Sequence, residues 1–397
     1  MSDSQSPRNF VASHIAALPK SGIRDFFEIV STMENVISLG IGEPDFATPW
    51  HIREAAIFGL ENGHTSYTSN LGLLTLRKAI CRMTAKAFGM AYNPEDECIV
   101  TVGVSEALDL VLRAILEPGD EVIYHQPCYV SYAPNIAMAY AIGVPVTTYE
   151  KNDFALDPAD LKKAITPKTK AIILNFPCNP TGANLTWEQK NEIAQIAIEH
   201  DLIVISDEIY AELTYEQRTP SIASIPGMKE RTVFLHGFSK AYAMTGFRIG
   251  YACGPFQIID AMMKIHQYSM LCAPITGQEA ALEALENGEK EMLKMKEQYA
   301  QRRNLMVKRF NEMGLKCLNP RGAFYVFPNI TSTGMNAMEF ATKLLQEKKV
   351  AAVPGSAFSD DPDSANYIRC SYATGIEQIK AALDLIEEFV NELKTDA

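Results

Sequence analysis

Hydrophobic and polar positions alternate in blocks through the middle of the chain. Between residues 98 and 254, short apolar runs recur, and segments with helical periodicity lie between several of them. Continuous apolar runs are typical of strands buried on both faces, and intervening helices favour a mostly parallel sheet. We therefore predict an α/β domain built on a seven-stranded, mostly parallel sheet. The expected strands are 98–102, 121–124, 144–147, 171–174, 202–205, 232–235 and 249–252.

The pattern changes after residue 287. A long charged helix is predicted up to about residue 312, followed by short strands near 323–327, 350–353 and 367–370. Short strands with flanking helices indicate a smaller α+β domain. We expect residues 48–286 to form the large domain, and residues 287–397 to form the small one, with residues 1–47 completing it.

Composition narrows the classes of partner. The 397 residues carry a net charge of −12 without a basic cluster, which argues against nucleic-acid binding. The eight cysteines contain no CxxC pair, so we expect reduced thiols and no metal site. The first ten residues, MSDSQSPRNF, lack the features of a signal peptide, and no apolar stretch approaches membrane-spanning length. A cytoplasmic protein that acts on small molecules, without a membrane partner, is the expectation.

Polar residues follow four of the predicted strands. They lie at 103–105, 175–182, 207–210 and 236–240. In open α/β sheets, ligands bind beyond the carboxyl ends of the strands. These four segments are therefore the candidates for a binding site.

The segment 103–105, Gly103-Val104-Ser105, leads from a strand into a helix. The first amides of that helix would point free N–H groups at an anion, which predicts a phosphate site. The alternative is an ordinary strand-to-helix turn capped by Ser105.

Lys240 and Arg248 lie eight residues apart, across small and glycine positions. An amine and a planar cation at this spacing suit the aldehyde and the phosphate of pyridoxal phosphate. The alternative is a surface lysine followed by a helix-capping glycine.

Asp207 ends an apolar run, where a carboxylate is costly unless a cation compensates it. A protonated pyridine nitrogen would do so. Tyr210 and Asn179 would both be able to donate to the phenolate oxygen of the same ring. The structural alternatives are a capping aspartate, a core tyrosine and a turn asparagine.

These motifs together resemble a known family. The segments GIGEPDF at 40–46, NPTG at 179–182, Ser239-Lys240 and YIR at 367–369 occur in the order found in pyridoxal-phosphate-dependent aminotransferases of fold type I, class I/II. That group includes the aspartate and aromatic aminotransferases. The resemblance covers nearly the whole chain and implies the fold type I architecture.

The resemblance implies roles for the cofactor-binding residues. Lys240 would bind the cofactor aldehyde covalently, and Arg248, Ser239 and the amides of Gly103 to Ser105 would hold the phosphate. The family often has a second serine three residues before the lysine, but this chain has Gly237 there.

Further roles concern the substrate and a neighbouring subunit. Tyr129 matches an aromatic residue that stacks on the cofactor, and Arg369 would bind the substrate α-carboxylate beside Asn179 and the Gly42 backbone. Tyr67 matches a tyrosine that reaches the phosphate of a second subunit. The implied working unit is a homodimer with shared active sites.

The implied reaction moves the amino group of an L-amino acid to a 2-oxo acid, with 2-oxoglutarate as the expected acceptor, by ping-pong kinetics. Lys240 would transfer the proton. Asp207 would keep the ring nitrogen of the cofactor protonated, and Tyr210 would donate a hydrogen bond to the ring oxygen. A β-lyase or decarboxylase on the same fold is one alternative. A non-catalytic ligand sensor is another, although the segment before Gly40 is too short and too weakly basic to supply a DNA-binding domain.

The sequence shows no second cation that would select a dicarboxylate. Candidates for the side-chain wall are Ile23, Phe26, Leu71 and the stretch 268–272, which are mostly apolar. This favours aromatic, aliphatic or long acylated amino donors over aspartate.

Overall fold

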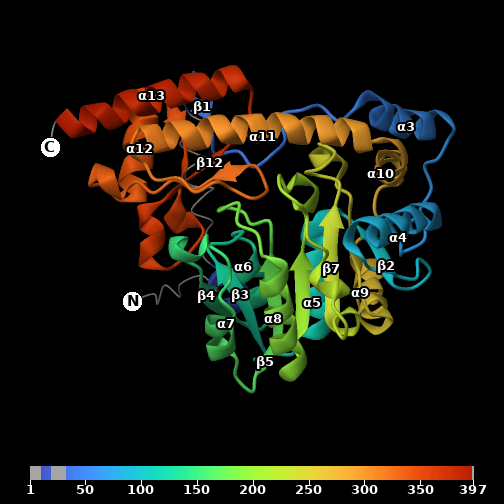
Figure 1. The fold of residues 1–397 in the computed structure, drawn as a ribbon. Coiled ribbons are helices and arrows are strands. Elements are labelled where there is room, and N and C mark those ends of the chain that lie inside the picture. The colour runs from blue at the N-terminus through green and yellow to red at the C-terminus, as the bar shows by residue number, and fades with distance from the viewer. Residues whose placement is uncertain (1–9, 19–32, 396–397) are drawn as a thin grey trace, which may run out of the picture.

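The computed structural model describes residues 10–18 and 33–395. Its main feature is a seven-stranded sheet with helices on both faces (Figure 1). The order across the sheet is β2-β8-β7-β6-β5-β3-β4. The strands are β2 (Cys98–Thr101), β3 (Glu121–Gln126), β4 (Ile142–Thr147), β5 (Thr169–Asn175), β6 (Ile203–Asp207), β7 (Thr232–Gly237) and β8 (Gly250–Cys253).

All neighbouring strands of this sheet are parallel except β8, which is antiparallel to β2 and to β7. The predicted seven-stranded, mostly parallel sheet is therefore confirmed. Several strands extend beyond the apolar runs, because backbone pairing continues into the polar residues that follow. Asp207 ends β6 and pairs in register with Asn175 at the end of β5.

Successive residues of the central strands pack on opposite faces, as expected for a sheet covered twice. Ile172 of β5 packs in a cluster that includes α8, whereas its neighbour Ile173 packs in a cluster that includes α5 and α9. The helices of this part are α3 (Trp50–Glu61), α4 (Leu74–Phe88), α5 (Gly103–Ile115), α6 (Tyr132–Met138), α7 (Pro158–Ala164), α8 (Trp187–Glu199), α9 (Phe256–Ser269) and α10 (Ile275–Asn287).

A second group of elements follows, separated from α10 by Gly288. Helices α11 (Glu289–Glu312) and α13 (Ile376–Thr395) run side by side in Figure 1, with α12 (Ala337–Lys348) beneath them. A three-stranded antiparallel sheet contains β11 (Val353–Pro354), β12 (Ile368–Ser371) and β9 (Tyr325–Val326).

The amino-terminal part of the chain joins this second group. Strand β1 (Ile37–Ser38) pairs in parallel with β10 (Val350–Ala351). A short helix, α1 (Ser13–Ala16), precedes it in the sequence. The domain boundaries at residues 47 and 286 stay a prediction. Within the described ranges, no helix combines the length and the apolar character needed to cross a membrane.

Candidate active site

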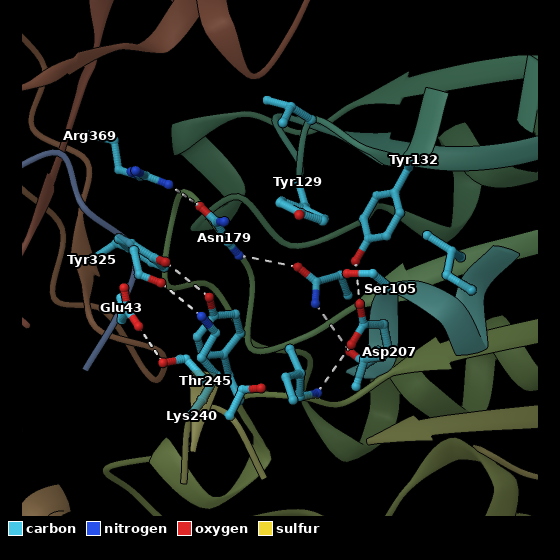
Figure 2. Close-up of a pocket in the computed structure, with 18 of the residues that line it drawn as sticks. Glu43, Ser105, Tyr129, Tyr132, Asn179, Asp207, Lys240, Thr245, Tyr325 and Arg369 are labelled. Atoms are coloured by element: carbon cyan, nitrogen blue, oxygen red, sulfur yellow. Dashed lines mark hydrogen bonds between the residues drawn. The ribbon is translucent and has the colours of Figure 1, made fainter. Parts of the chain in front are cut away.

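A cavity of about 660 Å³ lies beyond the carboxyl ends of β5, β6 and β7, where α5 begins (Figure 2). Segments from both groups of elements line it. It brings together most of the residues predicted from the sequence. These are Gly42, Val104, Ser105, Tyr129, Asn179, Asp207, Tyr210, Ser239, Lys240, Arg248 and Arg369.

Lys240 lies three residues after the end of β7, and its Nζ donates a hydrogen bond to the Gly42 carbonyl at 2.8 Å. Burial lowers the pKa of Lys240 to about 8. Arg369 and Arg248 act in the same direction because they repel a charged amine, and nearby carboxylates oppose them. The amine is therefore close to the balance between its charged and its nucleophilic form near neutral pH.

Asp207 lies at the opposite side of the cavity from Arg369 (Figure 2). It is buried, and burial raises the pKa of its carboxyl group above the ordinary value. Its Oδ2 accepts a hydrogen bond from the Tyr132 hydroxyl at 2.7 Å, and its Oδ1 accepts one from the Ile209 amide at 3.2 Å. A cationic ligand atom would stabilise the ionised form of this carboxylate.

Tyr132 was not predicted, although it also lines the cavity. It begins α6, three residues after Tyr129, and its ring packs edge-on against the Tyr129 ring at 5.8 Å. Its partner Asp207 is 75 residues away in the sequence. No local pattern marks such a contact, so only the fold reveals it.

Gly103 explains how Arg248 reaches the start of α5. Gly103 has a positive φ of 75°, and a Cβ atom there would lie 2.5 Å from Nη2 of Arg248. The guanidinium therefore packs directly against the first turn of α5, at a position where the positive φ and the close contact both favour glycine. Arg248 itself has a φ of 55°, and its Nη1 donates to the Thr245 carbonyl at 3.0 Å. The guanidinium of Arg248 and the start of α5 thus lie together at one end of the cavity.

Gly237 replaces the serine that many family members have. A Cβ atom at this position would lie 3.0 Å from the Gly250 Cα, 3.0 Å from Val104 Cγ2 and 3.1 Å from the Ile249 carbonyl oxygen. A serine at this position would therefore be tightly packed, and its neighbours would have to shift by a few tenths of an ångström. The chain lacks the second serine hydroxyl at this end of the cavity.

Arg369, on β12, is buried at the other end of the cavity. Its Nη1 donates to Asn179 Oδ1 at 2.8 Å, and its Nη2 donates to the Gly40 carbonyl at 2.6 Å. Its guanidinium lies over the rings of Tyr325 and Phe358, at 4.5 and 4.7 Å from their centroids. Among the described residues, its buried Nε has no hydrogen-bond partner. Burial lowers the pKa of Arg369, and a carboxylate ligand would reverse that effect.

Tyr210 and Tyr325 form a pair in the lining of the cavity. Their hydroxyl oxygens lie 2.9 Å apart, and burial raises the pKa of Tyr210 well above its ordinary value. Tyr210 therefore stays a hydrogen-bond donor. A Cβ atom on Gly42 would lie 2.5 Å from the Tyr325 hydroxyl, so this glycine allows the 40–46 segment to pass close by. Tyr325 was predicted only as part of a strand.

Three further lining residues were not assigned site roles from the sequence. Asn175 accepts from the Asn179 amide at 3.2 Å and donates to the Asp207 carbonyl at 3.2 Å, so it holds the NPTG turn against β6. The Thr245 hydroxyl donates to the Glu43 carboxylate, which joins the 40–46 segment to the lysine loop. These contacts fix the position of the predicted residues.

Some predicted residues do not line this cavity. Gly103 and Tyr67 are not among the lining residues, and Tyr67 is 81% exposed in the single chain. Of the expected side-chain wall, Leu71 and the stretch 268–272 are not among the lining residues, and Ile23 and Phe26 lie outside the described residues. In the described part of the chain, no group of three or more His, Cys, Asp or Glu side chains is arranged to hold a metal ion.

The arrangement fits pyridoxal phosphate. An amine of lowered pKa faces the cavity, a buried carboxylate on one side suits a pyridinium nitrogen, and a helix start with an adjacent arginine suits a phosphate. The second arginine, Arg369, lines the same cavity.

Comparison with known proteins agrees with this fit. The family model for class I and II aminotransferases matches residues 34–386. The chain is 52% identical to the putative aminotransferase YugH of Bacillus subtilis, over 97% of this chain and 99% of that protein. It is 46% identical to an aspartate aminotransferase of Pyrococcus abyssi, covering 94% and 96%. The solved structure of an aromatic aminotransferase from Pyrococcus horikoshii superposes with a TM-score of 0.88, at 45% identity, over 94% of this chain and 100% of that one.

The chain therefore belongs to the class I and II aminotransferases. It is a pyridoxal-phosphate-dependent enzyme that transfers the amino group of an amino acid to a 2-oxo acid. The predicted family, fold, activity and cofactor are confirmed.

Proposed function

We propose that Lys240 is the residue that binds the cofactor and moves the proton in this reaction. The observation that carries the proposal is the position of its amine, with a pKa of about 8, in a cavity between Asp207 and Arg369. Pyridoxal phosphate, when bound, supplies an aldehyde that bonds to amines and a ring that withdraws electrons from the substrate α-carbon. The neutral amine of Lys240 is then suited to take and return the α-proton.

The proposed role of Asp207 is to keep the cofactor ring nitrogen protonated. Desolvation makes an unpaired carboxylate costly at this position, so a bound cation lowers the free energy of the site. Tyr132 supports the ionised form through its hydrogen bond. Tyr210 and Asn179 would donate to the ring oxygen, and Tyr129 would stack on the ring.

The proposed phosphate site consists of Arg248, Ser239 and the amides of Gly103, Val104 and Ser105. The packing of Gly103 against Arg248 supports this assignment, because it places a cation beside the positive end of α5. Arg369 would bind the α-carboxylate of both substrates in a bidentate pair. Its unpartnered Nε, and its location beside Asn179 and the 40–46 segment that carries Gly42, support that role.

We propose that the amino donor has an apolar side chain, aromatic or aliphatic, and that 2-oxoglutarate is the acceptor. The described lining residues include three cations, Lys240, Arg248 and Arg369, and each is already assigned. Tyr325 supplies aromatic surface beside Arg369, and Tyr129 lines the same cavity. Relatives are named for aspartate and for aromatic amino acids, and half-reactions with both classes of donor distinguish the two choices.

We also propose a homodimer with shared sites, working in the cytoplasm. Tyr67 and Tyr268 are 81% and 89% exposed, and Trp50 and Phe58 also expose most of their surface, which suits burial by a second copy. All eight cysteines are free thiols, as expected in a reducing compartment.

The central test is covalent trapping. Hydride reduction of the protein loaded with pyridoxal phosphate should attach the cofactor to Lys240, as located by peptide mass spectrometry, and Lys240→Ala should abolish the adduct. Attachment to another lysine would refute the assignment. Half-reactions with a panel of amino acids, followed by cofactor absorbance, then identify the donor. Products of elimination or decarboxylation in that panel would instead favour a β-lyase or a decarboxylase.

Two variants test the other roles. Asp207→Ala should retain the cofactor but lose nearly all proton transfer, because the ring nitrogen would no longer hold its proton; near-normal turnover would reject this role. Tyr67→Phe should weaken cofactor binding only if subunits share sites. A fully active monomer at high dilution would exclude sharing.

A further inference from the structure

Glu106 and His266 form a buried pair immediately behind the start of α5. Oε2 of Glu106 accepts from the Val102 amide at 2.5 Å, and Oε1 lies 2.8 Å from Nδ1 of His266. The side chain of Glu106 is 10% exposed, and that of His266 is fully buried. A carboxylate that accepts the Val102 N–H on one oxygen can be paired by an imidazole N–H on the other, so Nδ1 of His266 is the donor. Neither residue lines the cavity.

The pair acts on the peptide that precedes the proposed phosphate cup. Val102 is the residue before the first turn of α5, and its side chain has no group that can cap the helix. Glu106 takes up the Val102 N–H from within the first turn. The orientation of this turn is thereby fixed, and the amides of residues 103–105 remain available for an anion.

His266 pairs with the carboxylate that Glu106 places here. A carboxylate next to a phosphate site repels the phosphate unless a donor or a cation is paired with it. Within the described chain, Glu106 is the one hydrogen-bond partner of the His266 ring, since its Nε2 has none. His266 lies on α9, which packs against α5, so the pair also ties the cup to a second helix.

We propose that Glu106 and His266 are positioning residues for the phosphate end of the cofactor. They hold the first turn of α5 in the conformation that presents its amides to the phosphate, without touching the cofactor. This inference rests on the proposed assignment of the phosphate to Arg248 and the cup at 103–105.

The test compares two ligands that differ only in the phosphate. Dissociation constants of pyridoxal phosphate and of pyridoxal are measured on the full-length, cofactor-free protein. Glu106→Ala should weaken pyridoxal phosphate binding about tenfold and pyridoxal binding less than about twofold, as expected for the loss of a charge-assisted hydrogen bond near one end of the ligand. Glu106→Gln, which keeps an acceptor for Val102, should lose less. Asp109→Asn, an exposed acid on the same helix paired with Arg113, is the matched control and should change neither constant.

The outcomes separate the two levels of the proposal. If Glu106→Ala does not fold, the test uses Glu106→Gln and His266→Gln. Both variants should lower the ratio of the affinity for pyridoxal phosphate to the affinity for pyridoxal. Equal losses for both ligands, or no loss for pyridoxal phosphate, would overturn the positioning role. Arg248→Ala tests the underlying assignment, because an unchanged ratio in that variant would mean that the phosphate lies elsewhere. If Arg248→Ala lowers this ratio but the Glu106 and His266 variants do not change it, only the inference about the pair is refuted.

Discussion

Replacing Lys240 by methionine should stabilise the cofactor-free protein at neutral pH while abolishing covalent cofactor binding. Burial lowers the pKa of this lysine from 10.5 to about 8. Below pH 8 the amine is charged in the folded protein, and its desolvation lowers the free energy of unfolding. That shift corresponds to roughly 3 kcal/mol. Loss of the hydrogen bond to the Gly42 carbonyl removes about 1 kcal/mol of the gain, which leaves about 2 kcal/mol.

The sign of the pH dependence follows from proton binding. Between about pH 8 and pH 10.5 the folded protein binds fewer protons at Lys240 than the unfolded chain does, so wild-type stability rises with pH across this window. The advantage of Lys240→Met should therefore be fully present below pH 8 and should disappear as the pH approaches 10.5. Methionine does not titrate, which makes the difference between the two proteins the useful quantity.

The assay is thermal unfolding of both cofactor-free proteins at several pH values through that window. The cofactor must be removed, because a ligand that binds only the folded state stabilises the wild type by itself. A Tm higher by a few degrees is expected for Lys240→Met at neutral pH. Lys264→Met, on the exposed face of α9, is the control and should show no pH-dependent gain. A lower Tm for Lys240→Met at neutral pH, or a difference that does not change with pH, would refute the reasoning.

Three further predictions concern catalysis and cofactor binding. Tyr132→Phe removes a hydrogen bond to the buried Asp207 carboxylate, and such a bond to a charged group contributes roughly 1.5–3 kcal/mol. The half-reaction rate should fall at least about tenfold with little change in substrate affinity. An unchanged rate would contradict the role of Tyr132. Gly237→Ser introduces the serine that many family members have. It should nevertheless weaken cofactor binding about tenfold, because the new side chain crowds Val104. Tighter binding in a fluorescence titration would show that the site has space for the serine. Arg369→Lys should raise KM for amino donor and 2-oxo acid together, by about 10- to 100-fold, because lysine cannot form a bidentate pair; an effect on only one substrate would argue against α-carboxylate binding.

The main chemical groups were predictable because each stands next to a strong local signal. Asp207 follows an apolar run, and Lys240 and Arg248 lie in one short segment. In a parallel sheet the carboxyl ends of the strands meet at one edge, so residues that follow separate strands converge there. The structure places all three on the same cavity.

The supporting contacts were not predictable in the same way. Tyr132 meets Asp207, and Tyr325 meets Tyr210, across 75 and 115 residues of sequence. In the sequence both tyrosines resemble core aromatics, because a hydroxyl partner on a distant segment leaves no periodic pattern. Several strands, such as β6, also end later than the sequence predicts, because a polar residue such as Asp207 ends the apolar run but continues the backbone pairing.

By itself, the sequence determined the class of fold, the order of the strands along the chain and the chemistry of the central groups. The periodicity of apolar residues and the types of residue are local properties, so they can be recognised in the sequence without knowledge of distant contacts. Only the tertiary structure decided the electrostatic state of those groups, including the lowered pKa of Lys240 and the raised pKa of Asp207, and the tight packing around Gly237. These properties depend on desolvation and on distances between segments far apart in the chain, which are fixed when the two groups of elements close around one cavity.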